Sequence, residues 1–227
     1  MKLMHKFLGA AAGIALTAGM AVADPALIFD LGGKFDKSFN EAAFAGAQRW
    51  AEETGGKFAE IELQSEAQRE QALRRFAEAG ANPIVMAGFA FADALSQVAA
   101  DYPDTKFAVI DVNWLDLPNV RGIGFAEHEG SYLVGMMAAQ ASKTGTVSFI
   151  GGMDIPLIRK FACGYAQGAK AVNPDATVIA NMTGTTPAAW NDPVKGSELT
   201  KAQISQGSDV VFSAAGGTGV GVLQTAA

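Results

Sequence analysis

The hydrophobic pattern of the chain alternates, from residue 24 onward, between short apolar segments and longer amphipathic ones. Short apolar runs bounded by turn residues predict strands, and apolar positions at helical spacing predict helices. The predicted strands are 26–30, 58–63, 83–87, 106–110, 121–125, 146–150, 177–180 and 209–213. The predicted helices are one that begins at 38, then 66–79, 90–100, 129–141, 155–172 and 193–206. Strands that alternate with helices in this way imply parallel sheets with right-handed crossovers.

The alternation starts again after residues 125–130, although the two halves show no convincing sequence repeat. We therefore expect an α/β protein with two Rossmann-like lobes, each built on a parallel sheet, and a cleft between the lobes. The expected first lobe is 24–127 and the expected second lobe is 128–227. In such open α/β sheets, ligands bind at the carboxyl ends of the strands.

The first strand and helix carry the clearest candidate chemistry. Asp30 ends the apolar strand, and Ser38 with Glu41 three residues later predicts a capping box at the start of the helix. Phe39 and Asn40 then fall in the first helical turn, where free N–H groups favour polar ligand atoms. Asp30 could instead be a helix cap or a solvated loop residue, but its place at the strand end favours ligand contact.

The second half has a counterpart to Phe39. Trp190 lies in a loop just before Asp192 and Pro193, which predict an N-cap and first helical position. An arbitrary aromatic residue is more often part of a core. The matching placement of Phe39 and Trp190 ahead of two helices favours a different hypothesis, in which they face each other across the cleft and hold a flat ring.

Three further segments are of interest. Asp111 ends an apolar strand, so we favour ligand contact over a capping role. Residues 151–154 predict a turn in which Asp154 is most simply an N-cap. The segment Gly216–Gly221 lacks the spacing of a dinucleotide fingerprint and has no Gly-Lys-Ser/Thr. Its glycines therefore indicate thin backbone beside a ligand rather than a phosphate loop.

Composition places the chain among ordinary globular proteins and predicts export. Of 227 residues, 49% are hydrophobic and 18% charged, which is enough for a sizeable core. Residues 1–23 combine an early basic segment, an apolar run and a small-x-small site, as in a secretory signal peptide. No cysteine follows that run, so we expect a free periplasmic protein without a lipid anchor. The single cysteine, Cys163, leaves no disulfide framework.

Charge and chemistry exclude several function classes. Without residues 1–23 the chain would carry 15 basic and 23 acidic side chains, a balance that disfavours nucleic acid and anionic membranes as partners. One histidine, His128, and one cysteine remain, without a cluster of zinc ligands. We therefore expect no metal, no cofactor and no enzymatic activity.

Several motifs together resemble one known family. They are Asp30-Leu31-Gly32-Gly33, Asp36-Lys37-Ser38-Phe39-Asn40, Gly88-Phe89-Ala90-Phe91-Ala92-Asp93, Val109-Ile110-Asp111, Glu129-Gly130-Ser131-Tyr132-Leu133, Gly151-Gly152-Met153-Asp154-Ile155-Pro156 and Ala215-Gly216-Gly217-Thr218-Gly219. They span essentially the whole chain after residue 23 and resemble the basic membrane protein family of ABC-transporter substrate-binding proteins, in which purine nucleoside receptors are the characterised branch. The resemblance implies a type I periplasmic binding protein fold that closes on a nucleoside.

The resemblance also implies roles for individual residues. By motif position, Phe39 and Trp190 look like the pair that stacks on the base, with Trp190 in place of the phenylalanine common in the family. The other implied ligand contacts are Asp30, Asn40, Phe89 and Asp111, with close backbone approach at Gly216 and Gly217. Family members continue past the position of Ala227 with an acidic residue and a lysine that bind the sugar. The sequence is therefore expected to be a fragment or to bind with impaired contacts.

The resulting prediction is a monomeric periplasmic binding protein that delivers a purine nucleoside, such as inosine, guanosine or adenosine, to a membrane ABC permease. One alternative keeps the class and changes the ligand to another heterocycle or small polar solute. A second alternative is a ligand-sensing domain that is not coupled to import. An enzyme is the third, and it would be supported only if a bound nucleoside were consumed.

Overall fold

A computed structural model describes residues 23–227, so the predicted signal peptide lies outside the described residues except for Ala23. The strands are β1 (Ala26–Phe29), β2 (Ala59–Glu62), β3 (Ile84–Ala87), β4 (Phe107–Ile110), β5 (Val120–Ile123), β6 (Thr146–Met153), β7 (Thr177–Gly184) and β8 (Val210–Ala214). The α-helices are α1 (Phe39–Thr54), α2 (Gln68–Glu78), α3 (Ala92–Val98), α4 (Glu127–Ala141), α5 (Pro156–Val172), α6 (Pro193–Ser205) and α7 (Thr218–Ala226). Two 3-10 helices lie at Phe89–Phe91 and Pro187–Trp190. Strands and helices alternate as the hydrophobic pattern predicts.

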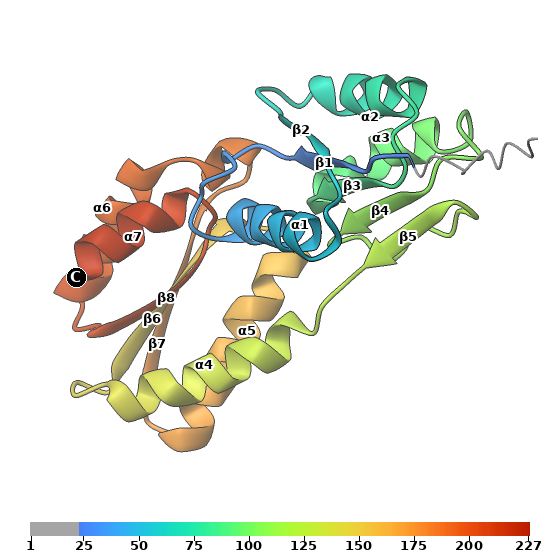
Figure 1. The fold of residues 1–227 in the computed structure, drawn as a ribbon. Coiled ribbons are helices and arrows are strands. Elements are labelled where there is room, and N and C mark those ends of the chain that lie inside the picture. Colours follow the sequence, from blue (N-terminus) through green and yellow to red (C-terminus); the bar gives the residue numbers. More distant parts are fainter. Residues whose placement is uncertain (1–22) are drawn as a thin grey trace, which may run out of the picture.

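The strands form two separate parallel sheets (Figure 1). The first has the order β2-β1-β3-β4-β5 and the second the order β7-β6-β8, and every neighbouring pair is parallel. We call the first sheet with its helices the first lobe and the second sheet with its helices the second lobe. In the second lobe, α4 and α5 pack against each other on one side of the sheet, and α6 and α7 lie on the other (Figure 1). The predicted α/β fold with two Rossmann-like lobes is confirmed.

Each lobe has its own hydrophobic core. In the first lobe, Ile28 and Met86 on neighbouring strands are fully buried with Leu73 of α2 and Leu95 of α3. In the second lobe the core includes Phe149, Tyr165 and Phe212, whose ring centroids lie 5.4–6.4 Å apart. The two cores are separate, so neither core fills the space between the lobes.

The predicted turn at 151–154 is wrong, because β6 continues to Met153. Gly151 pairs with Met182 of β7 and lies so close to it that a Cβ at position 151 would collide with the Met182 sulfur. A Cβ at Gly152 would overlap the ring of Trp190. These glycines therefore allow close side-chain packing on a strand rather than a change of chain direction.

The helix starts differ from prediction in two places. Ser38 makes no capping hydrogen bond, and the predicted capping box is wrong. The Asp36 carboxylate accepts hydrogen bonds from the backbone N–H groups of Ser38, Asn40 and Glu41 instead, at 2.9–3.2 Å. A carboxylate two residues earlier satisfies more of the free N–H groups than a serine hydroxyl can.

Asp154 is not the N-cap of α5, because that position is Ile155. Its carboxylate pairs with the guanidinium of Arg159, with N···O distances of 2.7 and 3.0 Å. The predicted N-cap at Asp192 is confirmed, since its Oδ1 accepts from the Lys195 N–H at 2.9 Å and Pro193 follows at the first helical position. Among the described residues, no helix combines the length and apolar character needed to cross a bilayer.

Candidate ligand-binding site

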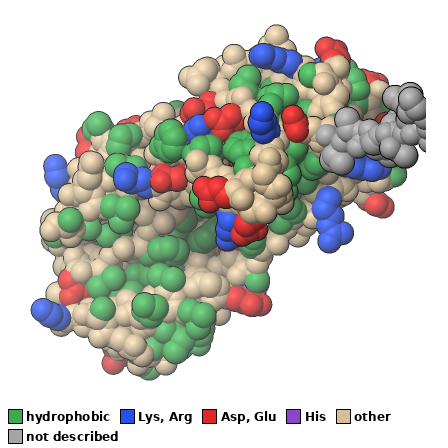
Figure 2. Space-filling model, viewed as in Figure 1, with side chains coloured by type: hydrophobic (Ala, Val, Ile, Leu, Met, Phe, Trp, Pro, Cys, Tyr) green, Lys and Arg blue, Asp and Glu red, His purple; other side chains and the backbone are tan. Residues whose placement is uncertain are grey.

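A cavity of about 350 Å³ lies between the two lobes. Its residues from the first lobe are Asp30, Leu31, Gly32, Asp36, Ser38, Phe39, Asn40, Ala87, Gly88, Phe89 and Asp111. Its residues from the second lobe are Leu157, Ile158, Phe161, Trp190, Phe212, Ser213, Ala214 and Gly216. The space-filling view shows hydrophobic side chains on the second lobe beside the hollow that separates the lobes (Figure 2). Seven of the eight residues predicted to contact a ligand line this cavity, and Gly217 does not.

Aromatic side chains from both lobes line the cavity. Phe39 is the first residue of α1, Phe89 begins the 3-10 helix after β3, and Trp190 ends the second 3-10 helix. Phe161 of α5 and Phe212 of β8 also line it, although neither was predicted from the sequence. Both lie inside regular elements at core-like positions, so their spacing resembles that of ordinary core residues. Phe212 could have been noticed because it lies close to the carboxyl end of its strand.

Trp190 is held in place by its surroundings. Its ring packs directly on the backbone of Gly152, where no side chain intervenes. The preceding carbonyl, that of Ala189, accepts hydrogen bonds from the hydroxyls of Thr218 at 2.8 Å and Thr183 at 3.0 Å. The ring is therefore presented to the cavity by a well-defined turn, which reduces the entropy lost when a ligand packs on it.

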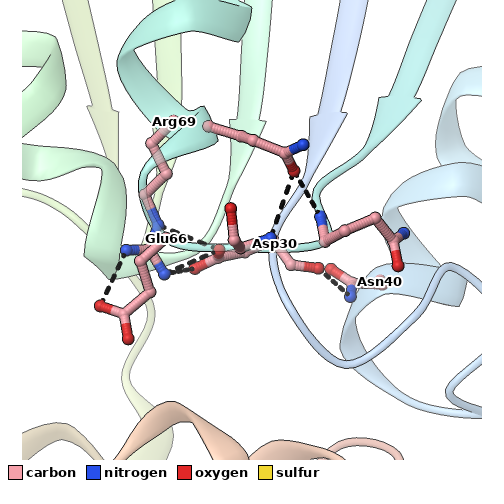
Figure 3. Close-up of polar contacts among 7 residues, drawn as sticks. Asp30, Asn40, Glu66 and Arg69 are labelled. Atoms are coloured by element: carbon pink, nitrogen blue, oxygen red, sulfur yellow. Dashed lines mark hydrogen bonds and ion pairs between the residues drawn. The ribbon is translucent and has the colours of Figure 1, made fainter.

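Asp30 is paired with Arg69 (Figure 3). Arg69 lies on α2, and its Nε and Nη2 donate to the two carboxylate oxygens at 3.0 and 3.2 Å. Glu66 contacts the same guanidinium at 3.5 Å. Burial raises the pKa of Asp30, and the charge of Arg69 opposes that rise. No local sequence pattern indicates a role for Arg69, because its partner lies 39 residues away in the chain.

Asn40 connects the end of β1 to the loop after it. Its Nδ2 donates to the carbonyl of Asp30 at 3.2 Å (Figure 3). It also donates to the carbonyl of Gly33 at 3.1 Å. Within the described part of the chain, its buried Oδ1 has no hydrogen-bond partner. The hydroxyl of Ser213, at the carboxyl end of β8, is likewise buried and without a partner there. Buried polar atoms are normally paired, so both are candidates to bind a ligand group.

Asp111 follows β4 in a left-handed backbone conformation, with φ of 67°. Its N–H donates to the carbonyl of Ile123 at 2.7 Å, which fixes the turn. Burial, reinforced by the negative charge of Glu127, raises the pKa of Asp111 to about 6, and Lys160 acts in the opposite direction. The surroundings of Asp111 therefore favour the protonated form of its carboxyl group.

The glycines after β8 have two different roles. Gly216 lines the cavity and has φ of 55°, a conformation that favours glycine. Gly217 lies outside the cavity where loops of the two lobes meet, since a Cβ on it would lie 3.1 Å from the carbonyl oxygen of Gly32 and equally close to Asn191 Oδ1 of its own lobe. The loops of the two lobes therefore meet at the rim of the cavity, next to Trp190.

Two parallel α/β lobes with a cavity between them, lined at the strand ends, form the type I periplasmic binding protein fold. Residues 25–227 match the model of the Bmp family, described as ABC transporter substrate-binding protein PnrA-like. The chain belongs to this family. The expected resemblance to basic membrane proteins is thus confirmed, and the family consists of ABC-transporter substrate-binding proteins rather than enzymes.

Individual relatives agree with this assignment. The chain is 34% identical over 205 residues to the ABC transporter nucleoside-binding protein BmpA of Lactococcus lactis, covering 88% of this chain and 57% of that protein. It is 32% identical over 212 residues to basic membrane protein A of Borreliella burgdorferi, covering 92% and 60%. A solute-binding protein of an ABC transporter system from Aeropyrum pernix has a similar structure, with a TM-score of 0.82, 32% identity and coverage of 90% and 58%. The chain thus spans less than two thirds of the length of these relatives.

Proposed function

We propose that the protein is the substrate-binding component of an ABC importer and that it binds a purine nucleoside between its lobes. The observation that carries this proposal is the aromatic lining of the cavity, with Phe39 on one lobe and Trp190 on the other. A flat heterocycle stacked between them would gain about 1–3 kcal/mol per ring. The name of the Lactococcus lactis relative, a nucleoside-binding protein, supports this ligand class.

Polar atoms in the cavity favour a ligand rich in hydrogen-bond donors. Asp30 is held as an acceptor by Arg69, and Asn40 presents an Oδ1 that needs a donor. Asp111 supplies a second carboxylate above its pKa of about 6. The N–H groups of a purine and the hydroxyls of a ribose provide such donors, and buried acceptors that stay unpaired are costly. Phe89 and Gly216 complete the proposed contacts.

Ligand binding would couple to closure of the lobes. A ligand shifts a conformational equilibrium only by its differential affinity for the two states. Phe39 and Trp190 lie on different lobes, so both can contact one ring only when the lobes are close. The closed form would then be the one that a membrane permease recognises. We further propose that the boundary between the lobes lies near residues 127–128. Residues 1–23 would direct export to the periplasm, where the protein would act as a monomer.

The test is isothermal titration calorimetry with inosine, guanosine, adenosine, cytidine and ribose. We expect micromolar or tighter binding of purine nucleosides, about 8 kcal/mol or more, and much weaker binding of ribose. Phe39→Ala should weaken binding by about 5- to 150-fold, which corresponds to the loss of one stacking contact. Phe35→Ala is the matched control, because Phe35 is 66% exposed and lies outside the cavity.

The proposal is wrong if no nucleoside binds. A thermal-shift screen that then finds an unrelated solute would retain the binding-protein class and change the ligand. Disappearance of the bound nucleoside during incubation, followed by chromatography, would instead indicate an enzyme.

A further inference from the structure

A second cavity, of about 540 Å³, lies between the lobes beside the first. The two cavities share four lining residues, namely Phe39, Asp111, Phe161 and Phe212. The second cavity extends from these residues toward the segment that connects the lobes, where Phe125 and the first turns of α4 line it. Trp190 and Asp30 line only the first cavity. The second cavity is therefore a neighbouring compartment with its own set of polar groups.

Two buried polar side chains in this compartment have no hydrogen-bond partner among residues 23–227. One is Glu127, the first residue of α4, whose side chain is 5% exposed and whose Oε2 is unpaired by hydrogen bonds. The other is Ser131, one helical turn later and 2% exposed, whose Oγ is also unpaired. Residues four positions apart on a helix share a face, so both groups serve the same compartment.

Lys160 forms only a long ion pair with Glu127. The Lys160 ammonium lies 3.6 Å from Glu127 Oε2, beyond hydrogen-bond distance, and its side chain is half exposed. Asp111 lines the same compartment and adds a second carboxylate. The carboxylates of Glu127 and Asp111 and the hydroxyl of Ser131 can accept hydrogen bonds from a positively charged donor. Burying such groups without a partner costs free energy.

The walls of the compartment are apolar. Phe39, Phe125, Phe161 and Phe212 surround the polar groups, and small residues of α1 complete the wall. An aromatic face attracts an organic cation through the ring quadrupole. A strongly hydrated metal ion would gain little from such walls, and among the described residues no group of three or more His, Cys, Asp and Glu side chains is placed to hold one.

From this juxtaposition we propose that the second cavity is a separate binding site for an organic ammonium ion, whose charged group is held by Glu127, Ser131 and Asp111 and whose apolar body packs on the phenylalanines. The ammonium supplies three N–H donors, one for each of these groups. Phe39 and Asp111 line both cavities, so the two sites adjoin, but the proposal does not rest on the identity of the ligand in the first cavity.

The probe for this site is 2-phenylethylamine, a cation at neutral pH, compared with the neutral 2-phenylethanol of nearly the same shape. Isothermal titration calorimetry on the full chain should show saturable binding of the amine, with the alcohol at least tenfold weaker. Glu127→Gln should weaken amine binding at least tenfold, and Ser131→Ala should weaken it to a smaller extent. Glu129→Gln is the matched control, since it removes the same charge from an exposed side chain two residues away.

Trp190→Ala separates the two cavities, because Trp190 lines only the first. This variant should retain amine binding and lose nucleoside binding. Circular dichroism and thermal unfolding confirm that each variant is folded. The proposal is overturned if the amine and the alcohol bind equally, if folded Glu127→Gln retains full amine affinity, or if Trp190→Ala abolishes amine binding. Binding of Ca²⁺ or K⁺ in place of the amine would also overturn it.

Discussion

Arg69, on helix α2 and 39 residues later in the chain, donates hydrogen bonds to both carboxylate oxygens of Asp30 (Figure 3). The side chains of the pair are only 10% and 16% exposed. Burial alone would favour a protonated Asp30, and the guanidinium favours the ionised form. Arg69 lies outside the residues that line the cavity, so its role is to position Asp30 and keep it an acceptor.

Removing Arg69 should therefore affect both stability and binding. Arg69→Gln leaves a buried carboxylate without its partner, which typically costs about 3 kcal/mol or more in the free energy of unfolding. Urea denaturation at pH 7 measures this change. Arg74→Gln on the same helix is the control, because its ion pairs are more exposed and should contribute less than about 1 kcal/mol. Equal losses in the two variants would contradict the role of the Asp30 pair.

Asp111 should make the folded protein sensitive to pH. Its pKa is raised from 3.8 to about 6, so folding favours its protonated form. This contribution to stability is present below about pH 4 and is lost as the pH rises through 6. Asp111→Asn removes the charge and keeps a residue that tolerates φ of 67°. The variant should thus be more stable than the wild type at pH 8, by a margin that shrinks toward pH 5.

Thermal unfolding of both proteins across this pH range checks the prediction. The quantity to follow is the difference in melting temperature between the variant and the wild type, because other carboxyl groups titrate in both proteins alike. A difference that does not change with pH would show that the Asp111 carboxyl is not perturbed by its surroundings.

Gly152 should be essential for the placement of Trp190. In Gly152→Ala the new methyl group overlaps the indole ring, so the ring must leave its position. We expect a loss of nucleoside affinity of tenfold or more, measured by calorimetry. Gly46→Ala on α1 is the control, since nothing lies within 4 Å of a Cβ there. That substitution should leave affinity unchanged and stabilise the helix by about 0.5–1 kcal/mol. Unchanged nucleoside affinity in Gly152→Ala would show that the position of the Trp190 ring does not matter for binding.

Gly217 should control how closely the lobes approach. An alanine methyl at this position would lie 3.1 Å from the carbonyl oxygen of Gly32 on the other lobe, which is closer than ordinary contact, and 3.1–3.2 Å from Asn191 Oδ1 and the Trp190 carbonyl oxygen on its own lobe. Gly217→Ala should therefore favour the open arrangement and weaken nucleoside binding. Small-angle scattering with and without inosine measures the compaction that binding causes. Wild-type compaction in the variant would show that this rim contact does not limit closure.

Local patterns in the sequence were sufficient for the order of the elements and for most of the cavity. Asp30 and Asp111 end apolar strands, and the carboxyl ends of parallel strands meet at one edge, so their convergence follows from periodicity and topology. Phe39 and Trp190 were identifiable because each lies beside a helix start. The family resemblance added Phe89, and the structure places it in the same cavity.

What could not be predicted depends on contacts between distant segments. Nothing local to Arg69 indicates that its partner is Asp30, and the spacing of Phe161 is that of a core residue. The predicted cap at Ser38 failed because Asp36, in a tightly folded loop, competes for the same N–H groups. The sequence predicts a turn at Gly152 because a single sequence does not show that the ring of Trp190 packs on this residue.

The most direct test of the central proposal follows the fluorescence of Trp190 alone. Trp50→Phe and Trp114→Phe remove the other two tryptophans, which lie on the surface and outside both cavities. Titration of this protein with inosine should give a saturable change in emission in the micromolar range, shifted to at least fivefold higher concentration by Phe39→Ala. If calorimetry detects inosine binding while the emission of Trp190 stays constant, or if inosine does not bind at all, the proposed stacking site is wrong.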